Sequence, residues 1–533
     1  MFKLKLSGKI FRSYTFIVFF IIFTFFEFKP VIASTKNFNI LDFGAIRDGK
    51  TLNHEFIQNA IDAAHNYGNG KVIIPSGIFL TGSIVLKSNV ELYFEKGAIL
   101  LGSTNIKDYK SFDRWKSLIL ADKQENIKIT GNGTIDGQGR NLALKIDSLF
   151  YVGQLDSSYY NLRRKRPNEL ARPQLVEFVE CKNILVEDIT LKNAACWVQT
   201  YDLCENLVLN RIKVISDAYW NNDGIDISDC KNVQITNCYV NSADDGICLK
   251  SHHEDSFNDN IIISDCTVRS SASAVKFGTA SVGGFKNVKI SNIKIFDTFR
   301  SAIAIESVDG GIIENIEVSN IRAVNTGNAI FIKLGHRNKD GNVGTIKNIK
   351  INDVKVQIPL NRPDDSYEIR GPELEFFHNP FPASITGIPE YYVENVELSN
   401  IEITYPGRGN NGLANLPIFR LTDVPENESD YPEFHMFGEL PSWAFYVRHV
   451  KNIKMQNVYV IAQDIDYRPA FVFDDVKDLE LKKLQILEEK IKTQIILKNV
   501  EVFDIDDSAQ KLVKVLKNLV SEENRIKTEE IRN

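Results

Sequence analysis

Five phrases in the middle of the chain decide the fold: CKNILVEDITLKN (181–193), CENLVLNRIKVIS (204–216), CKNVQITNCYVNS (230–242), NDNIIISDCTVRS (258–270) and FKNVKISNIKIFD (285–297). Each phrase has a polar turn, an Asn, and two short runs in which β-branched residues alternate with polar ones. Alternation at period two is typical of strands with one buried face. The phrases therefore predict repeated short strands.

The spacing of the phrases indicates a solenoid. Their shared Asn stands at positions 183, 206, 232, 260 and 287, in steps of 23, 26, 28 and 27 residues. A β-propeller blade would need about 40 residues, and the Leu-x-x-Leu-x-Leu pattern of leucine-rich repeats is missing. The sequence therefore predicts an all-β chain, a right-handed parallel β-helix in which equivalent positions stack coil on coil.

This β-helix is expected to occupy residues 35–505, with helical segments at both ends. Residues 53–67 carry apolar residues at helical spacing and are predicted to form a helix that caps the N-terminal end. The charged tail, residues 506–533, is predicted to be helical because four apolar residues form one stripe: Leu512, Val515, Leu516 and Leu519.

Three segments interrupt the repeat, at about residues 139–172, 356–391 and 405–445, and the last two are rich in Pro and aromatic residues. Long loops on a rigid scaffold usually carry the binding residues. We therefore expect these segments to form the walls of a cleft.

The first 33 residues have the pattern of a signal peptide. Four basic residues precede an apolar stretch from about Tyr14 to Phe26, and Val31-Ile32-Ala33 resembles a cleavage site. The apolar stretch is shorter than the roughly 20 residues that a membrane-spanning helix needs. We therefore expect a secreted or periplasmic protein with no membrane span after removal of residues 1–33.

Charge and cysteine content exclude several other classes. The chain has 63 Lys and Arg against 69 Asp and Glu, and this net charge of −6 does not favour nucleic acid as a partner. Seven cysteines lie between positions 181 and 266 without a C-x-x-C motif. We expect them to be small buried side chains rather than disulfides or metal ligands, and we expect the protein to be a monomer.

Two coils carry acids where strands should be: NNDGID (221–226) and SADDG (242–246). Asp223 and Asp244 are 21 residues apart, close to one coil, so their side chains should project from neighbouring coils about 5 Å apart. Such carboxylates repel each other, which raises at least one pKa and lets an acid and a base coexist. Glycoside hydrolysis needs this pair, although a calcium site or a solvated turn could also contain these residues.

The order of the motifs resembles glycoside hydrolase family 28, the polygalacturonase family, including its rhamnogalacturonase-like members. The resemblance covers roughly residues 38–500. Its landmarks before the acidic coils are DFGA (42–45), DGK (48–50), LTGS (80–83), GNGTIDG (131–137), Arg172-Pro173, Asn193 and Trp197.

The resemblance implies roles for the acids in a single-displacement, inverting hydrolysis. Asp223 falls on the third residue of the family's Asn-Thr-Asp, while Asp244 and Asp245 fall on its paired aspartates. Asp244 would be the general acid, and Asp223 and Asp245 would hold and deprotonate the attacking water. Asp226 would be a supporting carboxylate. The hydrolytic mechanism implies a polysaccharide substrate and no cofactor or metal.

Two family motifs are absent, which bears on the substrate. The family's Gly-His-Gly falls on Ala272-Ser273-Ala274, and its Arg-Ile-Lys falls on Ala304-Ile305-Glu306. The two cations that would hold a galacturonate carboxylate are therefore missing. Residues near the acids that could bind the substrate instead are Asn221, Asp226, Lys250, Lys276, Arg300 and Trp197.

The expected function is hydrolysis of a pectin-related acidic polysaccharide: polygalacturonan, rhamnogalacturonan or a substituted galacturonan. One alternative is a polysaccharide lyase on the same fold, for which Arg300 is the candidate base. Another is a carbohydrate-binding solenoid without catalytic activity. The sequence does not distinguish cleavage within chains from cleavage at their ends.

Overall fold

The computed structural model describes residues 35–112, 114–338, 341–367, 380–409, 418–488, 494–520 and 526–530. The predicted signal peptide, residues 1–33, lies outside the described residues. Parts of two of the predicted loop segments, residues 368–379 and 410–417, also lie outside them.

Short strands build about the first half of the fold, as far as Ser281. The N-terminal strands are β1 (Lys36–Asn39), β2 (Gly70–Ile74), β3 (Gly77–Thr81), β4 (Ile84–Val85), β5 (Val90–Phe94), β6 (Ala98–Gly102), β7 (Ser117–Asp122), β8 (Glu125–Gly131) and β9 (Thr134–Asp136). The central strands are β12 (Gln174–Val179), β13 (Lys182–Glu187), β14 (Thr190–Lys192), β15 (Gln199–Asp202), β16 (Glu205–Asn210), β17 (Lys213–Ser216), β18 (Ile225–Ser228), β19 (Lys231–Thr236), β20 (Tyr239–Ser242), β21 (Ile247–Ser251), β22 (Asn258–Ser264), β23 (Thr267–Ser270) and β24 (Val275–Ser281).

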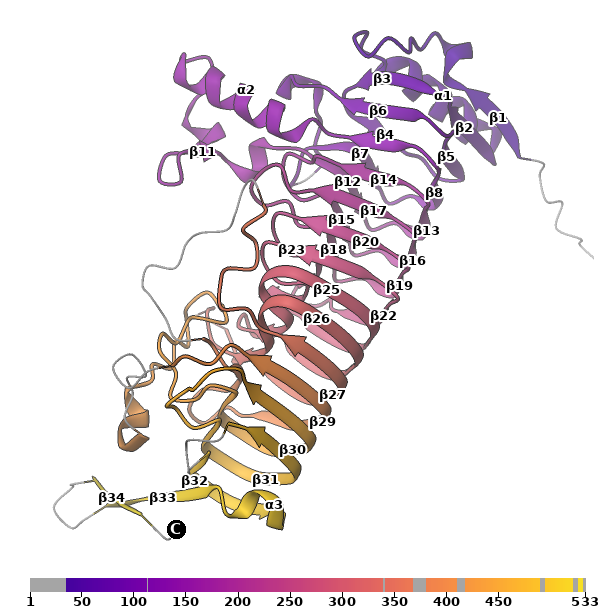
Figure 1. The fold of residues 1–533 in the computed structure, drawn as a ribbon. Helices are drawn as coiled ribbons and strands as arrows, with labels where there is room; N and C mark the ends of the chain where they lie inside the picture. The colour runs from indigo at the N-terminus through magenta and orange to yellow at the C-terminus, as the bar shows by residue number, and fades with distance from the viewer. Residues whose placement is uncertain are drawn as a thin grey trace, which may run out of the picture. The chain divides into compact units, whose positions relative to one another are not determined.

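The later strands, except for the four-residue β28, are longer and bend around the coil. They are β25 (Gly284–Ser307), β26 (Ile312–Leu334), β27 (Thr345–Gln357), β28 (Ala383–Thr386), β29 (Val393–Tyr405), β30 (Phe445–Ala462), β31 (Phe471–Leu487) and β32 (Ile495–Ile505). Figure 1 shows the strands stacked from coil to coil along the chain.

Each strand pairs in parallel with the strand one coil away. In the central region β13, β16, β19 and β22 form one stack, and β12, β15, β18, β21 and β24 form another. The strands β14, β17, β20 and β23 form the third. Three parallel stacks wound from one chain are a parallel β-helix, as predicted.

The repeated Asn of each phrase forms a ladder on the outside of the coils. Asn206 donates from Nδ2 to Asn183 Oδ1 at 3.0 Å, Asn232 donates to Asn206 at 3.1 Å, and Asn260 donates to Asn232 at 2.8 Å. These residues have φ between 56° and 59°, in the left-handed region that Asn tolerates better than most residues. Two requirements therefore favour Asn at this position: the left-handed backbone conformation and the amide hydrogen bond to the next coil.

The interior is filled by the apolar residues that alternate along each strand. Ile184, Leu207, Val233 and Ile261 occupy equivalent positions in four successive coils and are almost fully buried. All seven cysteines are also buried and unpaired. This confirms the prediction that they are packing residues.

The predicted N-terminal helix is present as α1 (His54–Tyr67), which packs against β1 and β2 (Figure 1). Its buried residues, Ile57, Ala60, Ile61 and Ala64, lie at helical spacing on the face that contacts the strands.

The prediction of a helical C-terminal tail is wrong. After one short helix, α3 (Asp507–Gln510), the chain forms β33 (Val513–Val520) and β34 (Ile526–Glu530). β33 continues the parallel stack, with Val513 opposite Ile495 and Val515 opposite Leu497. The open edge of β32 offers unpaired backbone N–H and C=O groups, which a neighbouring strand can pair with and a helix cannot. Valines at alternate positions also favour a strand at this point.

The first interruption of the repeat packs beside the coils, and its residues Leu142 and Ile146 belong to the main hydrophobic core. It contains α2 (Gly139–Tyr151), three-residue 3-10 turns, and an antiparallel pair, β10 (Tyr160–Asn161) and β11 (Arg166–Pro167). The described part of the last interruption contains a 3-10 segment, Ile418–Asp423.

Candidate active site

The strand register brings the two acidic coils together. β18 and β21 pair with Ile225 opposite Ile247, which makes the coil 22 residues long at this point. Asp223 therefore stands opposite Asp245, and Asp244 lies one residue before that position on the neighbouring coil. The backbone N–H of Gly224 donates to the carbonyl of Asp245 at 2.8 Å and locks this alignment.

The glycine after each acid is required by the close approach of the coils. A Cβ atom on Gly224 would lie 2.4 Å from Val240 Cγ1 and 2.6 Å from the carbonyl oxygen of Gly246. Gly246 meets the next coil in the same way, with a Cβ position 2.5 Å from Val268 Cγ1. The glycines of the Asp-Gly pairs therefore allow neighbouring coils to stack closely beside the aspartates.

Three carboxylates form the centre of the site. One oxygen from each of Asp223, Asp244 and Asp245 lies within 4.8 Å of the others. Asp223 and Asp245 are both 4% exposed, whereas Asp244 is half-buried. This confirms that the two acidic coils place their aspartates side by side.

Buried cations surround the carboxylates. Lys250 Nζ lies 2.8 Å from Asp223 Oδ2 and 2.8 Å from Asp226 Oδ1. Lys276 Nζ lies 3.2 Å from Asp245 Oδ2, and its side chain is only 1% exposed. The two lysines therefore hold the acids in place and neutralise part of their charge.

The electrostatic surroundings give the paired aspartates opposite proton affinities. Burial raises the pKa of Asp244, and the neighbouring charge of Asp245 raises it further. Burial would also raise the pKa of Asp245, but Lys276 and other nearby cations outweigh it and lower the pKa. A proton in the cluster is therefore more stable on Asp244 than on Asp245.

Asp223 and Asp226 share Lys250. Burial raises the pKa of Asp223 well above its ordinary value and raises that of Asp226 to about 6, while Lys250 offsets part of both effects. The two carboxylates in turn raise the pKa of Lys250, although burial opposes this. Asp226 has no exposed surface, so it supports Lys250 and does not form part of the cleft surface.

Glu306, which replaces the family's lysine, is buried behind Lys276. Lys276 Nζ lies 3.8 Å from Glu306 Oε2, and Thr279 Oγ1 donates to the same oxygen at 3.3 Å. Burial raises the pKa of Glu306 to about 8, and Lys276 only partly offsets this. Near neutral pH this carboxyl is therefore mostly protonated.

The remaining predicted substrate residues surround the same centre. Asn221 accepts hydrogen bonds at its Oδ1 from Arg166 at 3.1 Å and from Arg172 at 2.8 Å. The ring of Trp197 lies 4.4 Å below Lys250 Nζ. Arg300 is held by Glu433, with 2.7 Å between Nη1 and Oε1.

Sequence reasoning missed the residues that the loops contribute. Tyr431 and Glu433 come from the last interruption of the repeat, where Tyr431 OH lies 3.4 Å from Lys276 Nζ. Arg166 comes from the first interruption. The expectation that these two segments form walls of the site is confirmed, but no repeat pattern marks the individual residues.

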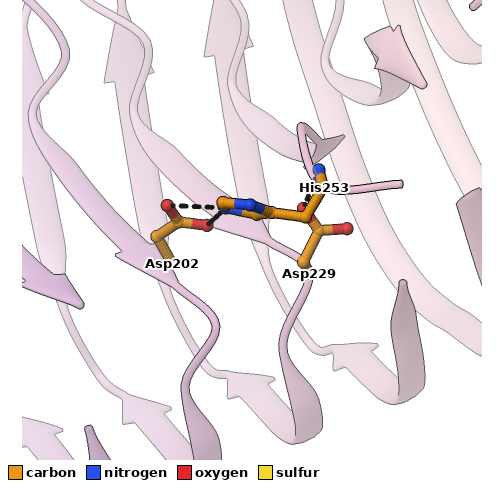
Figure 2. Close-up of side chains that lie close together, drawn as sticks. All are labelled: Asp202, Asp229 and His253. Carbon is orange, nitrogen blue, oxygen red and sulfur yellow. Dashed lines mark hydrogen bonds and ion pairs between the residues drawn. The ribbon is translucent and has the colours of Figure 1, made fainter. Parts of the chain in front are cut away.

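A second cluster of possible ligands lies at the C-terminal ends of β15, β18 and β21. Figure 2 shows His253 between Asp202 and Asp229, and the three side chains offer atoms within 4.8 Å of one another. Asp229 accepts hydrogen bonds from Ser251 Oγ and from the backbone N–H groups of His252 and His253. Hydrogen bonds within the turn thus account for this cluster.

The fold and the carboxylate cluster together define a parallel β-helix protein with the acid and base groups that glycoside hydrolysis uses. The sequence model of "Glycosyl hydrolases family 28" matches residues 65–359, which is 295 of the 533 residues. The chain therefore belongs to this family, as the motifs indicated.

Comparison with individual proteins agrees with this assignment. A probable polygalacturonase of Vitis vinifera is 28% identical over 293 residues, covering 50% of this chain and 56% of that protein. An exo-poly-alpha-D-galacturonosidase of Dickeya chrysanthemi is 30% identical over 254 residues, covering 40% and 42%. The chain spans about half the length of the curated relatives it matches.

Solved structures confirm the right-handed parallel β-helix. The hyperthermoactive exopolygalacturonase of Thermotoga maritima aligns with a TM-score of 0.55 at 24% identity, over 69% of this chain and 87% of that one. At this identity the likeness concerns the fold alone. Among the residues that the structure describes, no helix is long and apolar enough to cross a membrane.

Proposed function

We propose that the protein is a secreted, inverting glycoside hydrolase that cleaves a pectin-related acidic polysaccharide: polygalacturonan, rhamnogalacturonan or a substituted galacturonan. The observation that carries the proposal is the meeting of Asp223, Asp244 and Asp245 within 4.8 Å, with opposite pKa shifts on Asp244 and Asp245. The family membership supports the same reaction.

The pKa shifts of Asp244 and Asp245 support one assignment of the acid and the base. Asp244 is the half-buried member with the raised pKa, so it carries the proton that goes to the leaving glycosidic oxygen. Asp245 is ionised and takes the proton of the water as the oxygen attacks the anomeric carbon, while Asp223, which has a raised pKa and is ion-paired with Lys250, helps to hold that water. Lys250 and Lys276 keep these carboxylates in position.

The cations of the site favour an acidic sugar. We infer that Lys276, which stands opposite Ala304 in the next coil, and Arg300 serve instead of the two family cations that are absent at Ala304 and Glu306. A protonated Glu306 adds no negative charge beside Lys276, so an incoming carboxylate is not repelled near neutral pH. Relatives named as polygalacturonases support the same class of substrate.

The lyase alternative is less well supported. Its candidate base, Arg300, is ion-paired with Glu433 at 2.7 Å. Burial would lower the pKa of Arg300, but Glu433 and the aspartates outweigh it and raise the pKa. The guanidinium therefore stays protonated and does not serve as a base for removing a sugar C5 proton.

Stereochemistry is a separate test of the mechanism. Inverting enzymes usually hold their two carboxyl groups about 6.5–9.5 Å apart, and retaining enzymes about 5–5.5 Å. The aspartate oxygens here approach within 4.8 Å, so the spacing does not by itself favour inversion. Proton NMR of the first product anomer decides the question: inverted configuration supports single displacement, and retained configuration would make one aspartate a nucleophile.

The first experiment compares the wild type with Asp244→Asn on a panel of pectic and algal polysaccharides. New reducing ends without ultraviolet absorbance, lost in the variant, are expected for a hydrolase. Asp353→Asn, in an exposed turn where Asp353 pairs with Arg322, is the matched control and should retain activity. Absorbance at the wavelength of an unsaturated sugar that persists in Asp244→Asn would overturn the hydrolytic reaction.

The cellular form of the protein is part of the same proposal. Residues 1–33 would be removed on export, residues 35–505 would form the catalytic β-helix as a monomer, and residues 506–533 would be its tail. The strand series begins at Lys36, which supports the first boundary, whereas β33 extends the parallel stack beyond Ile505. Terminal sequencing of the exported protein and light scattering in solution test cleavage and oligomeric state.

A further inference from the structure

A pocket lies beside the acid cluster, between the coils and the first interruption of the repeat. It has a volume of about 360 Å³ and is lined in part by Arg114, Trp115, Arg166, Asn168 and Glu169. None of these residues was singled out by the sequence motifs or takes part in the proposed proton transfers. The pocket therefore needs an explanation of its own.

Aromatic rings connect the pocket to the reacting centre. The rings of Trp115 and Trp197 lie 4.9 Å apart, and the guanidinium of Arg114 lies 4.8 Å above Trp115. Lys250 Nζ lies 4.4 Å from the centre of the Trp197 ring, and it contacts Asp223 at 2.8 Å. A continuous series of contacts thus runs from Arg114 to a carboxylate that we assign to the attacking water.

The second arginine of the pocket also contacts the acidic coil. Arg166 donates to Asn221 Oδ1 at 3.1 Å, and its guanidinium lies 5.0 Å from the ring of Trp220. Its side chain is 15% exposed, so it is held in place but still reaches the pocket surface. Arg166 therefore holds a positive charge in a fixed position, and it contacts Asn221, two residues before Asp223.

The charge of the pocket is positive. Its acid, Glu169, lies 3.3 Å from Arg164 and 4.0 Å from Arg166, so it is already shared between two cations. Arg114 is exposed, and no carboxylate among the described residues forms an ion pair with it. An exposed guanidinium stacked on a ring is oriented for a carboxylate ligand, which it can bind through two parallel hydrogen bonds.

We propose that this pocket is a subsite for a carboxylate-bearing sugar unit of the polysaccharide, next to the unit at the acid cluster. Arg114 and Arg166, which both line the pocket, would bind the carboxylate. The inference rests on the proposed function and deepens it. It predicts that the enzyme needs an acidic unit on the Asp223 side of the cleaved bond.

The test separates binding from catalysis. In full-length protein carrying Asp244→Asn, calorimetry measures the Kd of a hexamer of galacturonic acid and of the same hexamer with every carboxylate methyl-esterified. Adding Arg114→Gln should weaken binding of the acidic hexamer by roughly tenfold or more, the usual effect of losing a charge-assisted contact. The ester should bind with less than about a twofold change, because its contact to the guanidinium is neutral.

Two further variants serve as controls. Arg114→Lys keeps the charge but loses the planar fork, so an intermediate Kd is expected. Arg211→Gln removes an exposed arginine that pairs with Asp188 in a turn between β16 and β17, and it should leave both Kd values unchanged. In the active enzyme, Arg114→Gln should raise KM roughly tenfold with little change in kcat on an acidic chain.

The outcomes distinguish the subsite from the function on which it rests. If wild type cleaves a pectic chain but Arg114→Gln has the same Kd and KM as its parent, the subsite is refuted and the function stands. Equal losses on the acidic and esterified hexamers would refute carboxylate recognition. If wild type cleaves no pectic chain and Asp244→Asn binds neither hexamer, both proposals fail.

Discussion

Replacing Glu306 by Gln should change how stability depends on pH. In the folded protein burial raises the pKa of Glu306 from its usual 4.5 to about 8. Between these two values the folded protein holds a proton that the unfolded chain has released, so the stability of the wild type falls as pH rises. Below pH 4.5 both states are protonated and the contribution is fully present.

The size of the effect follows from the two pKa values. The interval from 4.5 to about 8, at about 1.4 kcal/mol for each pH unit, corresponds to an upper limit of about 5 kcal/mol lost by the wild type at pH 8. Gln resembles the protonated acid and does not titrate. Glu306→Gln should therefore become progressively more stable relative to wild type from pH 5 to pH 8, by several kcal/mol.

Urea unfolding at pH 5, 6, 7 and 8, followed by circular dichroism, measures this difference. Glu317→Gln is the control for the substitution itself, because Glu317 is an exposed member of a surface ion pair with Lys289. A constant difference between Glu306→Gln and wild type across this range would refute the reasoning. It would mean that Lys276 keeps Glu306 ionised throughout.

Three further substitutions test other parts of the structure. Lys250→Met leaves Asp223 and Asp226 without the cation they share, so we expect the free energy of unfolding in urea to fall by about 3–5 kcal/mol and kcat to fall strongly. An unchanged kcat would show that Lys250 does not support the reaction. Arg172→Met removes the buried donors to Pro167, Ala195, Trp220 and Asn221, and should cost at least about 3 kcal/mol in thermal unfolding, whereas a loss below 1 kcal/mol would contradict this. Asn232→Ala loses two ladder hydrogen bonds and strains a left-handed residue, so it should destabilise by about 1–3 kcal/mol with activity unchanged at low temperature.

The repeat made the β-helix predictable from sequence. Each Asn in the ladder is determined locally, by a left-handed turn and by the amide one coil away, so it recurs with the coil and can be seen in the sequence. The acids were visible because they replaced apolar residues in this regular pattern. Their register could not be read from the sequence, because the coil length at this point, 22 residues, is what sets Asp223 opposite Asp245.

Neither the fold of the tail nor the site residues of the loops could be predicted, and the reasons differ. Residues 512–519 fit a helical stripe and a strand alternation about equally, and the free edge of β32 decided between them. Glu433 lies far from Arg300 in the chain and in a segment without a repeat, so only the folded structure shows their ion pair. Arg114 and Arg166 likewise acquire a role only from the pocket around them.

The ion pair between Arg300 and Glu433 has a consequence for the order in which the site is assembled. The aspartates lie in coils formed by residues 223–245, whereas Tyr431 and Glu433 arrive only with the last quarter of the chain. If folding proceeds from the N-terminus during synthesis, the carboxylates meet before one wall of the cleft exists. The carboxylate cluster and the wall that contains Tyr431 and Glu433 would then form at separate times, and truncation after β29 would remove this wall but keep the carboxylates.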